Sequence, residues 1–395
     1  MKTSSLASLM ALNTITQAQT DAISMPIRLL YGPLNKVTTS VMVGSGNEEI
    51  GQSIEVVVDY GSADFWVFGP NATINYGSQY LGFEPGACNT SPSYYYHLDN
   101  ATLQNFTQSY FYGGNSKILD ATHSVNDTLY FSSSPAIPNI EIALISSGVV
   151  RQYVPDGEPC PELSYDYGIM GLCPSTSGDN GPNLKTNLLN QGRISASVAS
   201  MYFSPPPADA PMAYNFTGTL LLGALPPADS YSGELIPVPI TTPVGGSGYY
   251  VSQPIISHAN TSIPADYPTE TCLVDSGSLS LTLPYTYDNT AFFNSTGFQN
   301  YEYDIVYPSN CEDLPRDLTL DFEFAGSGNA SVSVSVPYMY LARGSSGPGG
   351  VTLEGMCVMS VALGSACTFG APWFLGASVG VDDGEKVVWI AQGVL

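Results

Sequence analysis

The sequence predicts a predominantly β protein of two similar lobes, and three observations support this. Hydrophobic and polar residues alternate over 317–324 (DLTLDFEF) and 331–336 (SVSVSV), so every second side chain faces the same side of a strand. Glycine (39), proline (30) and tyrosine (26) are abundant, whereas long amphipathic helices are absent. The frame apolar–apolar–Asp–x–Gly–Ser occurs at 57–62 and again at 273–278. A repeat about one domain length apart indicates two related halves.

Shorter patterns predict the individual elements. The stretch 325–329 (AGSGN) separates the two alternating segments and predicts a hairpin turn. The apolar runs 55–60 (EVVVDY) and 219–224 (TLLLGA) predict buried strands. Leucines at helical spacing predict one helix over Asn183–Asn190.

A second, weaker echo supports the two-lobe interpretation. The segment 167–172 (YGIMGL) follows the first Asp motif, and 367–371 (CTFGA) follows the second. Each contains an apolar pair followed by glycine. Each lobe is therefore expected to contribute one Asp loop.

Charge excludes several classes of function. Lys and Arg number 10 against 34 Asp and Glu, which gives a formal net charge of −24. Nucleic-acid backbones and anionic lipid surfaces both require clustered bases, so neither is an expected partner. Only 11% of residues are charged and 44% are hydrophobic, which predicts a folded chain. In acid the carboxylates become neutral, and such a base-poor chain avoids self-repulsion.

The start of the chain and its sequons predict secretion. Residues 1–20 resemble a signal peptide, with Lys2 before a short apolar stretch and Ala18 near a cleavage point. No later stretch is long and apolar enough to span a membrane, and no hydrophobic tail suggests a lipid anchor. Nine N-x-S/T sequons occur, at Asn71, Asn89, Asn100, Asn105, Asn126, Asn215, Asn260, Asn294 and Asn329. An extracellular glycoprotein is expected.

Cysteine and histidine usage argues against a metal centre. The seven cysteines form no CxxC pair and the three histidines are scattered, so no metal or other cofactor is expected. In an oxidising compartment the cysteines are expected to form disulfides, with at least one left over because the count is odd.

The repeated aspartates, Asp59 and Asp275, suggest an acid–base pair. Gly61 and Gly277 permit a tight loop and close approach of another group. If the two loops meet, their carboxylates cannot both ionise cheaply, so they share one proton. The ionised partner can then deprotonate a water while the protonated partner hydrogen-bonds a carbonyl oxygen. This chemistry hydrolyses an amide without a metal or a covalent intermediate.

An ordered set of motifs resembles the pepsin-like aspartic proteases, of the secreted fungal type. VVVDYGSADFWV and CLVDSGS are similar to the two Asp signatures of that family. NFTGTLLLGALPPADSYSGELIPVPI, LPRDLTLDFEF, VPYMY, FGAPWFLG and VVWIAQ resemble later family segments in the same order. The resemblance runs from about Val41 to Gln392. It implies a bilobal all-β fold, with two pseudo-symmetric barrel-like lobes and an active-site cleft between them.

The resemblance also implies a division of the chain and a mode of action. Residues 21–228 would form the N-terminal lobe with the first Asp loop and a flap, and 229–395 the C-terminal lobe. The protein would be a monomeric endopeptidase that hydrolyses peptide bonds of an extended polypeptide at acid pH. Asp59 and Asp275 would be the catalytic pair. Gly61, Ser276 and Gly277 would support the loops, and Ser62 and Ser278 would hydrogen-bond the outer carboxylate oxygens.

The flap and the disulfides are also carried over by resemblance. SYFYGGNSKIL occupies the place of the family's flap hairpin. Counting back without gaps selects Tyr110 as the flap tyrosine, and is slightly preferred, whereas the Tyr-Gly pattern selects Tyr112. Trp66 would pack beneath the flap or donate its N–H to it. The pairings suggested are Cys311–Cys357, Cys272–Cys367 and, as a local guess, Cys160–Cys173, which leaves Cys88 as the odd thiol.

Three departures from the family pattern keep an alternative open. Tyr60 stands where the family has a Thr whose hydroxyl bonds to the opposite loop, and a Tyr hydroxyl would lie beyond that point. Leu279 replaces a usual Ser or Thr. About 20 residues, with only Arg28 and Lys36 as bases, separate the predicted signal from the first strand, whereas family zymogens carry a longer basic pro-segment. The alternative is a weak or inactive pseudoprotease that acts as an extracellular binding protein.

Overall fold

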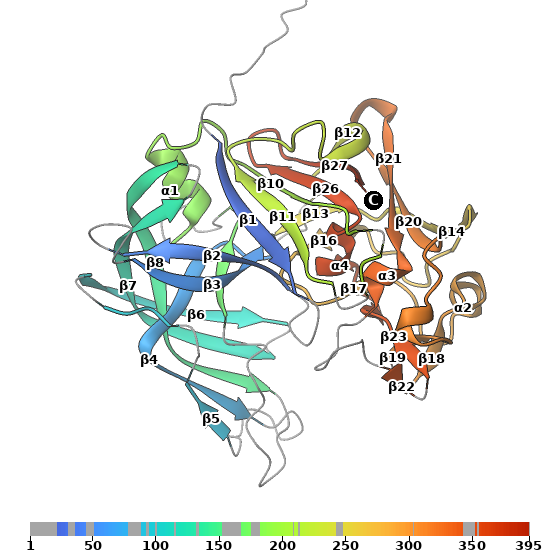
Figure 1. Ribbon diagram of the computed structural model, residues 1–395, viewed down its shortest axis with the longest axis horizontal. Coiled ribbons are helices and arrows are strands. Elements are labelled where there is room, and N and C mark those ends of the chain that lie inside the picture. Colours follow the sequence, from blue (N-terminus) through green and yellow to red (C-terminus); the bar gives the residue numbers. More distant parts are fainter. Residues whose placement is uncertain are drawn as a thin grey trace, which may run out of the picture.

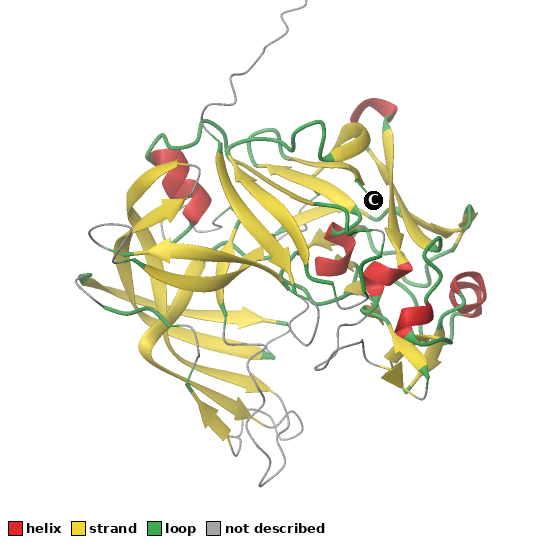
Figure 2. Cartoon of the chain, viewed as in Figure 1, coloured by secondary structure: helices red, strands yellow, loops and turns green. Residues whose placement is uncertain are grey.

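The computed structural model describes most of the chain after the first 21 residues. The described residues are 22–30, 36–44, 51–77, 88–91, 95–98, 101–113, 116–131, 134–151, 167–174, 182–207, 209–211, 214–241, 248–302, 304–342, 352–353 and 355–394. The predicted signal peptide, Asn100 and Cys160 lie outside them. Strands dominate and the few helices are short, which confirms the predicted all-β class (Figure 2).

Among the described residues, one large sheet contains the first twelve strands of the chain and the last two. Its order is β12-β27-β26-β10-β11-β1-β2-β3-β9-β4-β8-β7-β6, with β5 paired to β4 and a further pairing of β2 with β7. Its strands are β1 Ile23–Leu29, β2 Val37–Val43, β3 Gln52–Asp59, β4 Phe65–Gly77, β5 Cys88–Thr90, β6 Leu103–Tyr112, β7 Lys117–Phe131, β8 Ser134–Arg151, β9 Gly168–Gly171, β10 Val198–Phe203, β11 Phe216–Leu222, β12 Tyr231–Pro239, β26 Ala377–Asp382 and β27 Val387–Gly393.

Three smaller sheets make up the rest of the second half. The first has the order β13-β16-β25-β17-β24, with β13 Tyr249–Ser252, β16 Thr271–Val274, β17 Leu281–Leu283, β24 Val361–Leu363 and β25 Thr368–Phe369. The second has the order β15-β14-β20-β21, with β14 Ile255–His258, β15 Thr261–Ser262, β20 Thr319–Ala325 and β21 Ser331–Pro337. The third has the order β18-β19-β23-β22, with β18 Gln299–Tyr301, β19 Asp304–Tyr307, β22 Thr352–Leu353 and β23 Met356–Val358.

Helices are few in the described residues and only one lies in the first half. They are α1 Leu184–Asn190, α2 Thr290–Thr296, α3 Tyr338–Leu341 and α4 Ala371–Phe374, with 3-10 turns η1 Cys311–Asp313 and η2 Ser327–Asn329. The predicted helix at Asn183–Asn190 is α1, and the Asn183 side chain caps it by accepting from the Thr186 N–H. The predicted hairpin around 325–329 is also confirmed, because β20 and β21 pair from Thr319↔Pro337 to Ala325↔Ser331.

Strands from both halves meet in the middle of the molecule. In Figure 1 the first half of the chain lies on the left and the second half on the right, and β1, β10, β11 and β26 run between them. The backbone register joins β10 to β26 (Ala199↔Val381) and β1 to β11 (Met25↔Leu220). The first strand begins at Ile23, so the expectation of a strand-free stretch of about 20 residues after the predicted signal is wrong. Ile23–Leu29 forms β1, which pairs antiparallel with β11.

Candidate active site

The first Asp loop begins where a buried strand ends. Asp59 is the last residue of β3, and β9 runs parallel to β3 with Asp59 opposite Gly171. The Leu172 N–H donates to the Asp59 carbonyl oxygen (2.9 Å). Asp59 is almost completely buried. The echo motif at 167–172 is thus the strand that supports the first Asp loop.

The second Asp loop repeats this arrangement. Asp275 follows β16, whose parallel neighbour is β25, with Val274 opposite Phe369. The Asp275 N–H donates to the Phe369 carbonyl oxygen (3.0 Å). The echo motif at 367–371 therefore supports the second loop, as the first echo supports the first.

The two loops meet face to face. A Cβ on Gly61 would lie 2.4 Å from Asp275 Oδ1, and a Cβ on Gly277 would lie 2.5 Å from Asp59 Oδ1. No real Cβ tolerates such distances, so each carboxyl group rests against the glycine of the opposite loop. Two residues far apart in the sequence therefore form one carboxyl pair, and glycine at both positions is required for this approach.

The two carboxyl groups accept different sets of hydrogen bonds. Asp59 accepts from the Gly61 N–H (Oδ1, 2.7 Å) and from the Ser62 hydroxyl (Oδ2, 2.6 Å). Asp275 Oδ1 accepts from the backbone N–H groups of Gly277 (2.9 Å) and Ser278 (3.2 Å). The Ser278 hydroxyl donates to the Ser280 carbonyl oxygen (3.3 Å) instead. The expectation that this hydroxyl bonds the Asp275 carboxylate is therefore wrong. Backbone N–H groups of the loop bind the carboxylate instead, and the Ser278 side chain turns toward the Ser280 carbonyl oxygen.

The surroundings of the pair favour a neutral Asp275 carboxyl group. Burial, the adjacent Asp59 carboxylate and a hydrogen bond between the two groups raise the pKa of Asp275 well above its ordinary value. Two carboxyl groups this close share a proton, because both cannot ionise cheaply.

Lys36 is a site residue that sequence reasoning missed. It immediately precedes β2 and is half-buried. Burial lowers the pKa of Lys36, while the charges of Asp59 and Asp275 oppose that shift, and Lys36 in turn lowers the pKa of Asp275. The sequence offers no signal for this role, because the interaction of Lys36 with the two Asp loops depends on segments that are far apart in the chain.

A hydroxyl clamp connects the loops in one direction. The Ser276 hydroxyl donates to the Val58 carbonyl oxygen (2.7 Å) and accepts from the Tyr60 N–H (3.0 Å). Tyr60 does not return this arrangement, because its hydroxyl donates to the Ala199 carbonyl oxygen (3.0 Å). Its fully buried ring packs edge-on against Tyr249 and Phe374.

The hairpin of β6 and β7 places an aromatic group beside the first loop. Tyr112 pairs with Lys117 across the turn of this hairpin. Trp66 Nε1 donates to the Tyr112 hydroxyl (2.6 Å), which also contacts the Ser62 hydroxyl. The Ser62 hydroxyl in turn donates to Asp59 (2.6 Å), so Trp66 and Tyr112 lie beside the residue that binds this carboxylate.

Tyr110 lies in a different environment. It is buried, stacks on Trp66 (ring centroids 6.2 Å apart) and lies beside Asp64. Burial and then the charge of Asp64 raise the pKa of Tyr110. The geometry thus favours Tyr112 over Tyr110 as the residue nearest the carboxyl pair. The Tyr-Gly pattern selects Tyr112, whereas the gapless count slightly prefers Tyr110.

Lys117 is a second base that sequence reasoning did not single out. Its ammonium lies 5.1 Å from the centroid of the Trp66 ring and 5.8 Å from that of Tyr112. The side chain is 6% exposed. A cation over two aromatic faces stabilises their arrangement.

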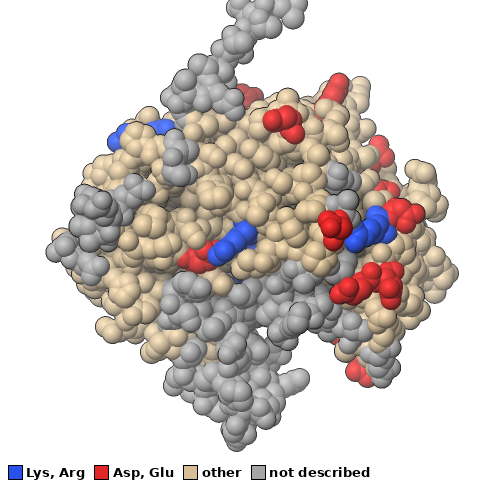
Figure 3. Space-filling view, in the orientation of Figure 1, with Lys and Arg blue, Asp and Glu red and all other residues tan. Residues whose placement is uncertain are grey.

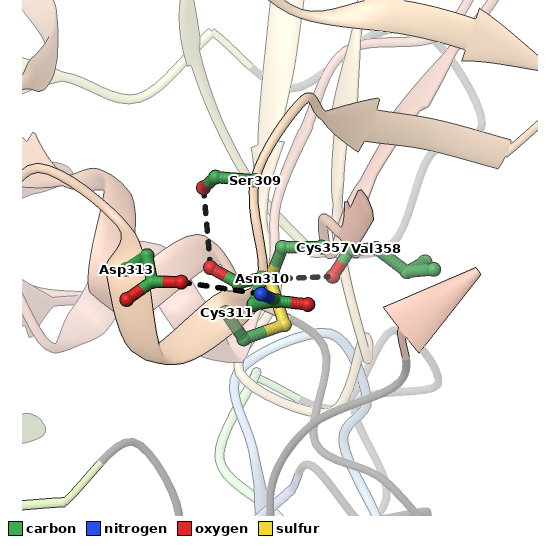
Figure 4. Close-up of a disulfide and its surroundings, with 6 residues drawn as sticks. All are labelled: Ser309, Asn310, Cys311, Asp313, Cys357 and Val358. Atoms are coloured by element: carbon green, nitrogen blue, oxygen red, sulfur yellow. Dashed lines mark hydrogen bonds between the residues drawn. A yellow bond between two sulfur atoms is a disulfide. The ribbon is translucent and has the colours of Figure 1, made fainter. Parts of the chain in front are cut away.

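Two of the predicted disulfides are confirmed and one is wrong. Cys311–Cys357 joins η1 to β23 (Figure 4), and Cys272–Cys367 joins β16 to the residue just before its parallel neighbour β25. Cys173 is a buried free thiol, so the guess that it pairs with Cys160 is wrong. Its thiol donates to the Tyr60 carbonyl oxygen, which places it against the first Asp loop.

The face of the molecule shown in Figure 3 carries scattered acidic groups and few bases. Within the described ranges, no cluster of three or more His, Cys, Asp or Glu is arranged to hold a metal ion. In the same part of the chain, no helix has both the length and the hydropathy of a membrane-spanning segment.

Comparison with known proteins supplies the family. The family model described as eukaryotic aspartyl protease matches residues 38–378. Pepsin B of Canis lupus familiaris is 26% identical over 283 residues, which cover 70% of this chain and 62% of the relative. Candidapepsin-2 of Candida parapsilosis is 30% identical over 224 residues (55% and 45%). Secreted aspartic protease 1 of Candida albicans is 27% identical over 215 residues (54% and 47%). The matched segments thus span less than two thirds of these relatives.

Proposed function

The chain belongs to the eukaryotic aspartyl protease family, and on that basis we propose that it is an aspartic endopeptidase. The observation that carries the proposal is the contact between the two Asp loops. Asp59 and Asp275 each rest on the opposite loop's glycine, and burial together with their proximity raises the pKa of Asp275. A carboxyl pair with one proton is the requirement for water-activated hydrolysis of an amide.

The reaction follows from the two protonation states. Asp59 takes a proton from a water as the water oxygen bonds to the peptide carbonyl carbon, while Asp275 gives its proton to the carbonyl oxygen. The tetrahedral diol then collapses as the carbon–nitrogen bond breaks. Asp59 gives its proton to the departing amine, and one diol hydroxyl returns a proton to Asp275. The pair ends in its starting state, and no covalent intermediate forms.

The substrate is proposed to be an extended polypeptide held beneath the β6–β7 hairpin. In this proposal Tyr112 is the flap tyrosine, because its hydroxyl connects Trp66 to the Ser62–Asp59 bond. Backbone groups of the hairpin edge would pair with the peptide as an added strand does.

We also propose that the protein is secreted as a monomer, with residues 21–228 and 229–395 as its two lobes. Two disulfides within the second half suit an oxidising compartment. Seven sequon asparagines are exposed, which leaves room for glycans at Asn71, Asn105, Asn126, Asn215, Asn260, Asn294 and Asn329. Two of the relatives above are named as a candidapepsin and a secreted aspartic protease.

The direct test is cleavage of a denatured protein between pH 3 and 5, with binding of a statine peptide as a second measurement. A statine peptide imitates the tetrahedral diol, so it reports a formed carboxyl pair whichever sequence is cleaved. Cleavage that is lost in Asp275→Asn is the expected result. Absence of both turnover and statine binding would refute the proposal.

A pseudoprotease that binds an extracellular ligand is the second candidate, and Tyr60 favours it. The Tyr60 hydroxyl bonds to Ala199 rather than to the opposite loop, so only one half of the clamp is present. Statine binding without turnover would favour this candidate over the protease.

A further inference from the structure

A buried ion pair joins the two halves of the chain behind the carboxyl pair. Lys185 lies on α1 and its Nζ is 2.6 Å from Asp383 Oδ2, in the turn between β26 and β27. The Lys185 side chain is 1% exposed. The Ser197 hydroxyl donates to the same carboxylate oxygen (2.6 Å). Removing two charged groups from water costs free energy, and the attraction between them offsets little more than that cost. A buried ion pair of this kind therefore contributes little net stability to the fold.

Tyr249 links this ion pair to both Asp loops. Its hydroxyl accepts from the Lys185 ammonium (2.6 Å) and lies 2.8 Å from both Asp383 Oδ1 and the Leu172 carbonyl oxygen, to which its single hydrogen can be donated. The Leu172 N–H in turn donates to the Asp59 carbonyl oxygen. The Tyr249 backbone pairs with Val274, the residue before Asp275.

Tyr60, the residue that departs from the family pattern in the first Asp motif, contacts the same network. Its ring contacts Tyr249 edge-on, with the centroids 6.1 Å apart. Its hydroxyl bonds to Ala199 on β10, and Ala199 is paired with Val381 on β26, the strand that leads to Asp383. Tyr60, which does not supply its half of the clamp, therefore contacts Tyr249, and Tyr249 connects the two loops by another route.

We propose that Lys185, Asp383 and Tyr249 form a tether that positions the Asp59 and Asp275 loops, in place of the clamp half that Tyr60 does not supply. The proposal rests on the protease function above. These three are positioning residues, because they act on the carboxyl pair through Leu172 and Val274 and do not touch the reacting atoms.

Two variants separate positioning from stability. Tyr249→Phe keeps the ring and removes the hydroxyl, and Tyr338→Phe is its matched control, since Tyr338 is also fully buried and donates to a backbone carbonyl, that of Thr296 (2.9 Å). The double variant Lys185→Met with Asp383→Leu removes both charges together. This avoids an unpaired buried ion and is expected to leave the unfolding transition near that of the wild type.

The expected result is a fall in kcat with little change in KM. Tyr249→Phe and the double variant should each lose between about 10- and 100-fold in kcat, as misplacement of catalytic groups does. Their kcat–pH profiles should also shift, because the shared proton depends on the separation of the two carboxyl groups. Tyr338→Phe should lose as much stability as Tyr249→Phe but keep kcat and the pH profile.

The outcomes that would overturn the tether differ from those that would overturn the protease. Wild-type kcat and pH profile in both variants, with an active parent, would overturn the tether alone. If the parent neither cleaves nor binds a statine peptide, the protease proposal fails, and a crystal structure of Tyr249→Phe decides the tether. An unchanged separation of the Asp59 and Asp275 carboxyl groups in that crystal overturns it, and a changed separation supports it.

Discussion

The two Asp loops share a backbone and differ in side chains. In each, a parallel neighbouring strand hydrogen-bonds the chain at the Asp, and the glycine two residues later donates to that Asp's own Oδ1 (2.7 Å for Asp59, 2.9 Å for Asp275). The residue between them is Tyr60 in one loop and Ser276 in the other. Ser276 reaches the opposite loop with a short hydroxyl, whereas Tyr60 reaches past it to β10.

Two kinds of contact therefore hold one pair of loops. A short hydroxyl satisfies a donor and an acceptor of the partner loop at once. An aromatic side chain replaces that local bond with packing in the core between the halves, where Tyr249 and Phe374 surround it. The loops also differ in their serines, since only Ser62 donates its hydroxyl to a carboxylate. Asp275, whose pKa is raised, is the carboxyl group of the pair that no serine hydroxyl of the described residues reaches.

The largest expected effect comes from breaking the pair itself. Asp275→Asn removes the carboxyl group that protonates the carbonyl oxygen, so kcat should fall on the order of 10²- to 10⁴-fold. Steady-state cleavage of a denatured protein at acid pH measures this. Glu385→Gln removes an exposed carboxylate elsewhere and should leave kcat unchanged. Equal activities for the two variants would show that Asp275 has no part in the chemistry.

Making the two loops alike is expected to have the next largest effect. From the sequence alone, Tyr60→Thr would restore the missing clamp half and raise activity. The structure adds a cost, because removal of a fully buried ring between Tyr249 and Phe374 should lower the free energy of unfolding by about 3–5 kcal/mol. Urea unfolding measures this cost, and kcat is corrected for the folded fraction by statine titration. A variant as stable as the parent would contradict the packing role of the ring.

Removing the clamp hydroxyl should cost less. Ser276→Ala leaves the Val58 carbonyl and the Tyr60 N–H without their buried partner, which should lower the free energy of unfolding by about 1–3 kcal/mol. Ser278→Ala is the matched control, because the Ser278 hydroxyl serves only its own loop in a 3.3 Å bond to Ser280. Thermal unfolding compares the two. Similar losses would mean that the contact between the loops has no special weight.

The raised pKa of Asp275 should appear as a pH dependence of stability. Because the pKa of Asp275 is raised in the folded state, its contribution to stability is fully present below the unfolded pKa of about 4 and is lost as the pH rises through the folded pKa. Within that window the free energy of unfolding should fall by up to about 1.4 kcal/mol per pH unit. Urea unfolding of the parent and of Asp275→Asn from pH 4 to 8 measures this slope. A variant that keeps the parent's slope would assign the effect to another group.

The smallest effect is expected from Lys36, which acts on both loops at a distance. Its charge lowers the pKa of Asp275, so Lys36→Met should raise the upper pKa of the pair. The alkaline limb of the kcat/KM profile should move to higher pH by up to about one unit. Lys386→Met, at an exposed turn, is the control. A shift to lower pH would show that the Lys36 charge does not act on the pair as described.

Much of the fold and of the site could be predicted from local sequence. The Asp motifs, their echoes, the hairpin around 325–329 and helix α1 each depend on patterns within about ten residues. The ordered motifs predicted the family that the family model then matched over 38–378. Local patterns left the flap tyrosine open between Tyr110 and Tyr112, because the sequence does not show which of the two hydroxyls meets Trp66 Nε1.

The sequence by itself determined that two Asp loops with flanking glycines exist, because a carboxylate at a buried strand end followed by glycine is a local feature. Only the tertiary structure decided which groups meet them. The Tyr112 contact, the free thiol of Cys173 and the placement of Lys36 all depend on segments that are far apart in the chain. So does the pairing of Lys185 with Asp383, since a buried charge reveals its partner only when two distant elements exclude water together.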